Sequence, residues 1–360
     1  MSRPLIQAGE PAPWFVAASS VNPAFHFDTL GGHYIVLCFF GDGQTPAARA
    51  VIEGFLGAQT EFCTREIVFL GVTCKPEDQT LSRQILHPMY AKFIWDFNQK
   101  VSGLYGCIRA DSGTRNSFHP VTLVINPLLQ ISAVFPWRDL SRHVASVLDY
   151  CRRQPVLPDG PAQPQAPVLR VPGVLAPDDC RALITRYLDA GGEPSGFMRA
   201  EAGQTTAAFD PYFKRRRDIN LEHHPDLLPR INQRIESRLL PYIQRALRFR
   251  PTRFERYLVG CYDARDQGTF LPHRDDTSPG TRHRRFALSL PLNEDYLGGD
   301  LRFPEFGRQR YRPAAGEAVV FSSALLHEVT PVTHGARFVL LCFFYDEEHA
   351  RLRAAAPADR

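Results

Sequence analysis

Apolar residues in the first part of the chain form two patterns in turn, one typical of buried strands and one typical of a helix. Continuous apolar runs at residues 34–40, 67–72 and 122–125 predict three buried strands. After the first of them, residues 48–62 carry apolar side chains at helical spacing, which predicts an amphipathic helix. Strands that alternate with helices predict an α/β sandwich with parallel strands.

The second part of the chain has short apolar segments separated by glycine-rich turns. A helical stretch at residues 227–239 comes first, and the strand-like segments that follow occupy residues 256–262, 285–293, 298–303, 316–321 and 337–345. Short strands with such turns are typical of an antiparallel double sheet. We therefore expect a double-stranded β-helix jelly roll with preceding helices.

A proline-rich stretch separates the two patterns. Prolines recur with a strict period of three, at positions 155, 158, 161, 164 and 167. Polyproline II has three residues per turn, so this spacing predicts a semi-rigid spacer. The expected organisation is a first domain at residues 1–152, a linker at 153–172, a second domain at 173–348 and a frayed tail at 349–360.

Composition narrows the class of protein and its surroundings. Of the 360 residues, 44% are hydrophobic and 22% are charged, as in globular proteins. The eight cysteines stand singly, and neither an apolar signal segment nor a membrane-length apolar run is present, so we expect a cytoplasmic protein without membrane contact. The dense basic clusters at 214–217 and 282–285 lack interleaved aromatics, which favours a solvated face or the rim of an anionic-substrate site over nucleic-acid binding.

The first half resembles the thioredoxin-like peroxiredoxins in its order of segments. The opening at residues 9–13 and the strand and turn at 122–127 match that family. The resemblance implies a thioredoxin-like fold over residues 1–152. In peroxiredoxins the loop after the first strand carries a nucleophilic cysteine, and here Ala48 occupies that position. Alanine cannot form a thiolate, so we interpret this domain as a noncatalytic module for docking, recognition or stabilisation.

Two histidines and one aspartate in the second half have the side chains that iron(II) requires. His273 and Asp275 are two residues apart, so on a strand both point to one side. With His327 they can bind one face of a ferrous ion and leave the other positions open. The chain holds two further His-x-Asp triplets, but neither lies among the glycine-flanked strands.

Residues 170–348 resemble the 2-oxoglutarate/Fe(II)-dependent oxygenases of the prolyl 4-hydroxylase-like branch. The motifs that carry the resemblance follow one another in the family's order and lie at 259–262, 273–275, 292–301, 326–332 and 335–337. Carried over by position, the resemblance implies that His273, Asp275 and His327 bind Fe2+. It also implies that Arg337 binds the distal carboxylate of 2-oxoglutarate, where collagen-type enzymes have lysine.

Two positions near these motifs allow more than one interpretation. Tyr262 matches a tyrosine that contacts the cosubstrate, although a buried core tyrosine is nearly as good an interpretation. His334 is a rival for the third metal ligand, but it matches no position of the family, so we favour His327.

The resemblance implies a dioxygenase that uses dioxygen and 2-oxoglutarate, releases succinate and CO2, and hydroxylates its substrate. That substrate is a protein or peptide residue, with proline as one candidate, or a small molecule. Such enzymes often need L-ascorbate to keep iron reduced. The alternative is a noncatalytic sensor for iron or 2-oxoglutarate, or a redox-linked adaptor. The linker prolines are themselves candidate targets, although we favour the spacer.

Overall fold

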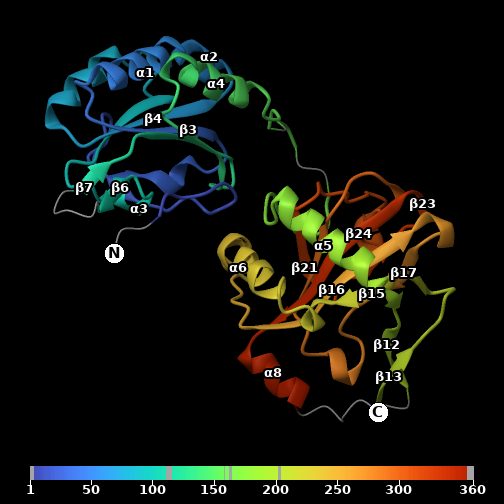
Figure 1. The fold of residues 1–360 in the computed structure, drawn as a ribbon. Helices are drawn as coiled ribbons and strands as arrows, with labels where there is room; N and C mark the ends of the chain where they lie inside the picture. Colours follow the sequence, from blue (N-terminus) through green and yellow to red (C-terminus); the bar gives the residue numbers. More distant parts are fainter. Residues whose placement is uncertain (1–3, 111–115, 158, 162–163, 202–203, 355–360) are drawn as a thin grey trace. The chain divides into compact units, whose positions relative to one another are not determined.

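The computed structural model describes residues 4–110, 116–157, 159–161, 164–201 and 204–354. They form two compact units, Met1–Gly160 and Pro161–Arg360, shown in Figure 1. Each unit has its own hydrophobic core and its own sheets. We describe each unit separately.

The first unit is built on a five-stranded sheet in the order β5-β4-β3-β8-β9. Its strands are β3 (Tyr34–Gly41), β4 (Ile67–Thr73), β5 (Ala91–Trp95), β8 (Val121–Ile125) and β9 (Ile131–Pro136). Only the pairs β3–β4 and β4–β5 are parallel, and β8 runs antiparallel to both of its neighbours. The expectation of parallel strands is therefore wrong for β8, which runs opposite to β3. A short turn joins β8 to β9, so this pair is antiparallel as well, and β9 again runs in the direction of β3.

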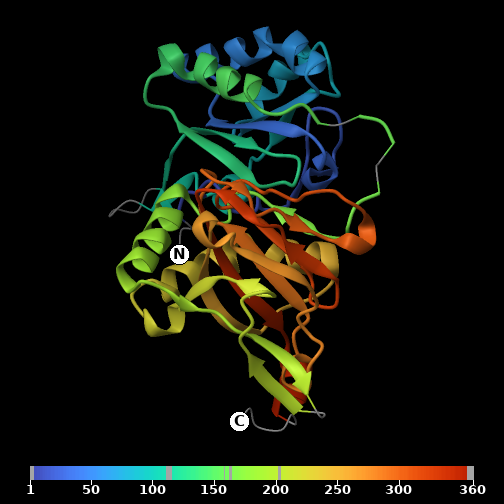
Figure 2. The same cartoon turned by 90° about the vertical axis from the view of Figure 1, so that its right-hand side faces the viewer.

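Helices cover one face of this sheet, as Figures 1 and 2 show. They are α1 (Pro46–Gly57), α2 (Gln59–Thr64) and α4 (Leu140–Arg152). The single helix expected at residues 48–62 is divided at Ala58, whose backbone N–H turns back to Leu56 and Phe55 and ends α1. Gly57, a weak helix former, precedes the break.

Smaller elements complete the first unit, and several pack on the other sheet face. They are β1 (Val16–Ala17), β2 (Phe25–His26), α3 (Lys100–Leu104), β6 (Ile108–Ala110), β7 (Asn116–Phe118) and the 3-10 helices Phe27–Leu30 and Pro76–Gln84. Phe15, Phe27 and Tyr105 join the core on this face. The unit is thus an α/β sandwich, as expected from the sequence.

The second unit contains two facing antiparallel sheets. The larger has the order β10-β21-β18-β24-β16-β15-β11, and the smaller β14-β17-β22-β20. The larger sheet comprises β10 (Leu169–Val171), β21 (Ala318–Ser322), β18 (Phe286–Pro291), β24 (Ala336–Tyr345), β16 (Arg253–Asp263), β15 (Arg217–Asn220) and β11 (Glu193–Pro194). The smaller comprises β14 (Lys214–Arg215), β17 (Thr269–His273), β22 (His327–Val329) and β20 (Leu301–Arg302). This is the jelly roll predicted from the sequence.

Three helices pack against the larger sheet on its face away from the smaller one. They are α5 (Pro177–Ala190), α6 (Leu228–Arg238) and α7 (Leu240–Leu247). Their apolar residues, among them Leu183, Ile235 and Ile243, share one core with the sheet. A hairpin of β12 (Phe197–Glu201) and β13 (Gln204–Ala208) extends from this unit, in yellow-green in Figure 2. The short strands β19 (Leu297–Gly298) and β23 (Val332–His334) form a separate antiparallel pair.

The structure differs from the domain bounds predicted from the sequence at both ends of the second domain. Residues from Pro164 onward already pack on this unit: Ala166 is buried, its N–H donates to the Tyr311 hydroxyl at 2.8 Å, and β10 joins the larger sheet. The unit therefore begins before residue 173. In the segment expected to be a frayed tail, helix α8 spans Glu347–Ala354, whereas residues 355–360, like Pro158 of the expected linker, lie outside the described residues.

In the part of the chain that the structure describes, none of the helices combines the length and the apolar character needed to cross a membrane.

Candidate active site

Antiparallel pairing of β17 and β22 brings two of the predicted ligands together. His273 ends β17 and His327 begins β22, and the two are direct partners in the register. Their ring centroids lie 4.3 Å apart. Asp275 lies two residues beyond β17 rather than on it, which corrects the expectation of two ligands on one strand. Its N–H donates to the Ser323 carbonyl at 2.9 Å, which holds the aspartate beside the histidines.

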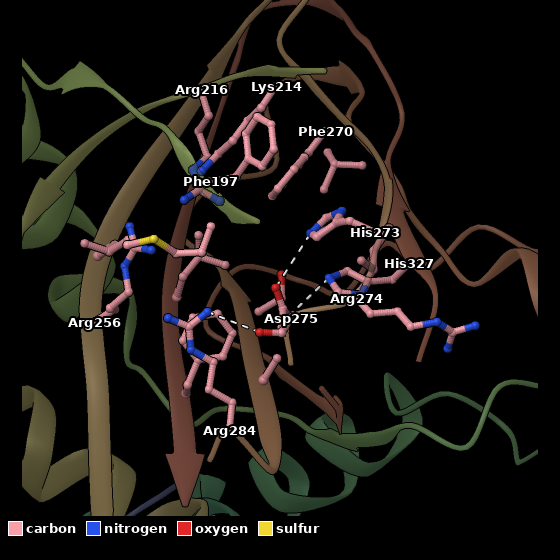
Figure 3. Close-up of a pocket in the computed structure, with 18 of the residues that line it drawn as sticks. Phe197, Lys214, Arg216, Arg256, Phe270, His273, Arg274, Asp275, Arg284 and His327 are labelled. Atoms are coloured by element: carbon pink, nitrogen blue, oxygen red, sulfur yellow. Dashed lines mark hydrogen bonds and ion pairs between the residues drawn. The ribbon is translucent and has the colours of Figure 1, made fainter. Parts of the chain in front are cut away.

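The three side chains converge on one point, as Figure 3 shows. His273 Nε2 lies 3.7 Å from Asp275 Oδ1, and His327 Nε2 lies 3.4 Å from Asp275 Oδ2. One ligand atom from each residue lies within 4.8 Å of the others, and no other group of three such residues does so among the described parts of the chain. Two imidazole nitrogens and one carboxylate are a donor set that suits iron(II).

Backbone carbonyls fix both imidazoles in the form that binds metal. His273 Nδ1 lies 2.7 Å from the Leu271 carbonyl, and His327 Nδ1 lies 2.9 Å from the Leu325 carbonyl. A carbonyl can only accept, so each Nδ1 carries the proton and each Nε2 keeps its lone pair for a metal. Burial, assisted by the neighbouring His327, lowers the pKa of His273 to about 3, so His273 is neutral at physiological pH.

A buried cluster supports the backbone at Asp275. Arg284 donates to the Asp275 carbonyl at 3.3 Å, and its guanidinium also forms an ion pair with Glu255 at 2.8 Å. His283 Nε2 lies 2.5 Å from the other oxygen of Glu255. Burial alone raises the pKa of Glu255, but the hydrogen bonds from His283 and Arg284 outweigh it and hold that pKa well below its usual range.

We expect Glu255→Gln to lower the free energy of unfolding by about 3 kcal/mol at pH 7, because it leaves Arg284 buried without a charge partner. The pKa of Glu255 is lower in the folded state than in the unfolded state. Its contribution to the free energy of unfolding is therefore fully present above the unfolded pKa of about 4.3 and is lost as pH falls through the folded pKa. Urea denaturation at several pH values measures this effect, and the variant should show a weaker loss of stability in acid.

Glu347→Gln is the matched control, because Glu347 forms a similar pair with Arg253 at an exposed position. It should cost less than about 1 kcal/mol. Equal losses in the two variants would contradict a structural role for the buried cluster.

Arg337, the predicted cosubstrate ligand, is buried in the same cavity as the three ligands. It lies on β24, is 3% exposed, and donates to the Ser289 hydroxyl at 3.2 Å. In the register it pairs with Tyr262 on β16, whose ring lies 5.3 Å from its guanidinium carbon. No carboxylate pairs with Arg337 among the described residues, so its charge is available to an anion in the cavity.

Tyr262 is buried and lines the cavity, which fits both interpretations made from the sequence. Its hydroxyl accepts a hydrogen bond from Arg216 at 3.3 Å. The rival ligand His334 lies on β23, is exposed, and is not part of the three-residue cluster.

Several basic residues of the cavity were not identified as site residues from the sequence. Lys214 and Arg284, expected on a solvated face or a rim, are each about 5% exposed or less and line a cavity of about 440 Å³. Arg216 and Arg256 line it as well, and Figure 3 shows both side chains there. Lys214 and Arg216 are two residues apart, so on a strand both point to the same side and Arg217 points to the other. This spacing could have distinguished the two cavity residues from the exposed Arg217.

The loop of the first unit that corresponds to a peroxidase site contains no cysteine. Ala48 is fully buried in the first turn of α1, and its N–H donates to the Thr45 hydroxyl that caps the helix. Burial raises the pKa of seven of the eight thiols, with Cys74 reaching about 11; these thiols are Cys38, Cys74, Cys107, Cys151, Cys180, Cys261 and Cys342.

We therefore expect these seven thiols to react with iodoacetamide at pH 7 at least about a hundredfold more slowly than an unperturbed thiol. Mass mapping after timed labelling measures this, with the urea-denatured protein as the control in which all eight react. Rapid consumption of hydrogen peroxide by one of these thiols would contradict the noncatalytic interpretation of the first unit.

Comparison with known proteins assigns the two halves of the chain to two different families. Residues 257–345 match the 2OG-Fe(II) oxygenase superfamily, and residues 8–134 match the AhpC/TSA family. The first match implies Fe2+ and 2-oxoglutarate as cofactors. Both resemblances predicted from the sequence are confirmed.

Among individual relatives, a PKHD-type hydroxylase of Shewanella sp. (strain MR-7) is 30% identical over 187 residues, which cover 47% of this chain and 74% of that protein. A PKHD-type hydroxylase of Synechococcus is 35% identical over 118 residues, or 29% of this chain, and the match spans about half, 51%, of its length. Peroxiredoxin Q of Xanthomonas campestris aligns with 40% of this chain and 97% of its own, at 14% identity and a TM-score of 0.35.

Proposed function

This chain belongs to the PKHD-type hydroxylase family, and on that premise we propose that it is an iron- and 2-oxoglutarate-dependent dioxygenase. Its substrate would be a peptidyl residue, with proline as one candidate, or a small molecule. The observation that carries the proposal is the convergence of His273, Asp275 and His327 in a cavity that also contains Arg337, which has no carboxylate partner within the described part of the chain.

The donor set fits the metal that the superfamily uses. His273 and His327 offer Nε2 lone pairs because their Nδ1 atoms are bonded to carbonyls, and Asp275 offers a carboxylate oxygen. These three residues would hold Fe2+ and leave positions for a cosubstrate and dioxygen. With Fe2+ held there, the site would supply an oxidative decarboxylation in which 2-oxoglutarate and dioxygen give succinate and CO2, and the second oxygen atom would hydroxylate the substrate.

Arg337 would bind and orient the distal carboxylate of 2-oxoglutarate. A guanidinium offers a planar pair of donors that matches a carboxylate, and Ser289 holds this one in place. Tyr262 packs between Arg337 and Arg216, with ring-to-guanidinium distances of 5.3 and 5.6 Å. It would keep the two cations apart and shield the carboxylate that is bound to Arg337 from water.

Apolar side chains give the cavity the dry surroundings that this chemistry needs. Phe270 stacks on the His273 ring at 3.4 Å, and Phe321 lies edge-on to the His327 ring at 4.7 Å. These contacts fix the two imidazole planes and keep water from their faces. Arg284 holds the Asp275 backbone, so all three ligands are positioned before a metal binds.

The remaining assignments concern the rest of the chain and its surroundings. We propose that the first unit is a docking or recognition module, since Ala48 removes the peroxidase nucleophile. L-Ascorbate would serve as the reductant that restores oxidised iron. Eight free cysteines fit a reducing, cytoplasmic compartment.

The test is hydroxylation itself. The protein, with Fe2+, 2-oxoglutarate, ascorbate and air, is incubated with a library of proline-containing peptides and small molecules. The proposal predicts a mass gain of one oxygen atom on a substrate, matched by an equal amount of succinate and absent without Fe2+ or 2-oxoglutarate. Oxygen incorporation that does not depend on 2-oxoglutarate would contradict it.

A further inference from the structure

The cavity holds many more positive charges than negative ones. Seven basic side chains line it, whereas Asp275 is its one lining carboxylate. Four of these cations have acidic partners nearby: Arg199 pairs with Glu201, Arg216 with Asp218, Arg274 with Glu305 and Arg284 with Glu255. Lys214, Arg256 and Arg337 have no carboxylate partner among the described residues.

Two of these three cations are accounted for. Lys214 is buried, and its amino group donates at 2.7 Å to both the Ser195 hydroxyl and the Gly196 carbonyl. Arg337 is the proposed ligand of 2-oxoglutarate. Arg256 remains: within the described residues it has neither a hydrogen bond nor an ion pair, although it is only partly exposed.

A β-bulge turns Arg256 toward the cavity. The register of β16 with β24 shifts between Glu255 and Leu258, and Arg256 has a φ of 58°. Phe254 and Tyr257 flank Glu255 and Arg256, and both pack in the core on the helix-covered face of the sheet. Glu255 and Arg256 therefore point to the opposite face, toward the cavity. A bulky residue with positive φ is strained, and such strain concentrates at functional sites.

The surroundings of Arg256 favour an anion there. Burial and the neighbouring cations Arg284 and Arg216 lower its pKa, and its nearby acids Glu255 and Asp218 are already paired with those two arginines. Figure 3 shows Arg216, Arg256 and Arg284 on the side of the cavity away from His273 and His327. An added negative charge would relieve repulsion among the three guanidinium groups.

Arg256 and Arg337 lie at different levels of the larger sheet. Arg337 lies opposite Tyr262, six residues along β16 from Arg256. At the rise of a strand, the two arginine Cα atoms are roughly 15 to 20 Å apart. Leu258 and Leu341 form an apolar floor between them.

We propose that Arg256 binds a carboxylate of the primary substrate, on the side of the metal site away from Arg337. This inference rests on the proposed function. The two charges of Fe2+ and the one of Arg337 are balanced by Asp275 and the two carboxylates of 2-oxoglutarate, so among the described arginines that line the cavity Arg256 alone is left without a negative partner. A substrate with a single carboxylate near the reacting C–H balances it, which selects acidic small molecules or peptides with an acidic residue beside the target.

The test measures binding without turnover. The protein is loaded with Zn2+ and saturating 2-oxoglutarate, and benzoate and its neutral isostere benzamide are titrated with ligand-observed NMR. We expect benzoate to bind about tenfold more tightly, since benzoate forms an ion pair and two parallel hydrogen bonds with the guanidinium, whereas benzamide offers only one neutral carbonyl acceptor. Arg256→Gln should remove the preference and Arg256→Lys should keep part of it. Arg215→Gln, which removes a neighbouring charge outside this cavity, should change nothing.

Each other outcome has a definite meaning. Equal binding of benzoate and benzamide by the wild-type protein overturns the inference, and so does a preference that persists in Arg256→Gln, because benzoate would then be bound by the metal or by Arg337. Tighter binding of phenyl phosphate than of benzoate overturns the carboxylate assignment in favour of phosphate. Binding of 2-oxoglutarate to the Zn2+-loaded protein is measured in a separate titration, and its failure counts against the proposed function alone.

Discussion

We expect Asp275→Ala to abolish stable Fe2+ binding and to lower the rate of succinate formation at least about a thousandfold. Asp275 is the one carboxylate that lines the cavity, and both histidine Nε2 atoms lie within 3.7 Å of its oxygens. Without it, two neutral imidazoles remain and no negative charge offsets that of the metal. Anaerobic titration with Fe2+, followed by a succinate assay, measures both losses.

His334→Ala is the matched control for this variant. His334 was the rival third ligand, and it is exposed on β23, outside the three-residue cluster. Its replacement should leave Fe2+ stoichiometry and succinate formation unchanged. A loss of iron in His334→Ala, or full iron binding in Asp275→Ala with an unaltered melting temperature, would contradict the assignment of the ligands.

Arg337→Gln should weaken 2-oxoglutarate binding by a factor of roughly 30 to 1,000 while Fe2+ binding is retained. Removing the charge partner of a buried carboxylate costs about 2 to 4 kcal/mol, and tenfold in affinity corresponds to about 1.4 kcal/mol. Arg337 is 3% exposed, so little solvent screens the interaction. Calorimetric titration of the Fe2+-loaded protein under argon gives the dissociation constant.

Two further variants sharpen this prediction. Arg337→Lys keeps the charge but loses the planar pair of donors, so it should retain part of the affinity. Arg265→Gln removes an exposed arginine that pairs with Asp263 outside the cavity, and it should bind 2-oxoglutarate as the wild-type protein does. Equal affinities in Arg337→Gln and Arg265→Gln would show that another cation, such as Arg256, holds the cosubstrate.

Local patterns in the sequence predicted most of the fold. The apolar runs at residues 34–40 and 67–72 became β3 and β4 because a buried strand needs apolar side chains on both faces. The short strands of the second half were predictable for the same reason, together with their glycine turns. The break of the helix at Ala58 and the direction of β8 were not, because both depend on tertiary packing and on turn geometry that residue type specifies weakly.

The candidate site was predictable only as far as its motifs extended. His273, Asp275 and His327 carry a spacing and a context that indicate metal binding, and the structure brings them together. The buried Glu255–Arg284 pair and the cavity-facing Arg256 have no comparable signal. The Glu255–Arg284 pair forms between residues that are 29 positions apart in the sequence. The position of Arg256 depends on a β-bulge.

The most direct test of the central claim is anaerobic binding of Fe2+ and 2-oxoglutarate, followed by succinate release on admission of air, in the wild-type protein and in His327→Ala. We expect one Fe2+ and one 2-oxoglutarate to bind per wild-type chain, succinate to form after air is admitted, and all three to be lost in His327→Ala. Failure of the wild-type protein to bind Fe2+, or equal binding and succinate release by the variant, would contradict it.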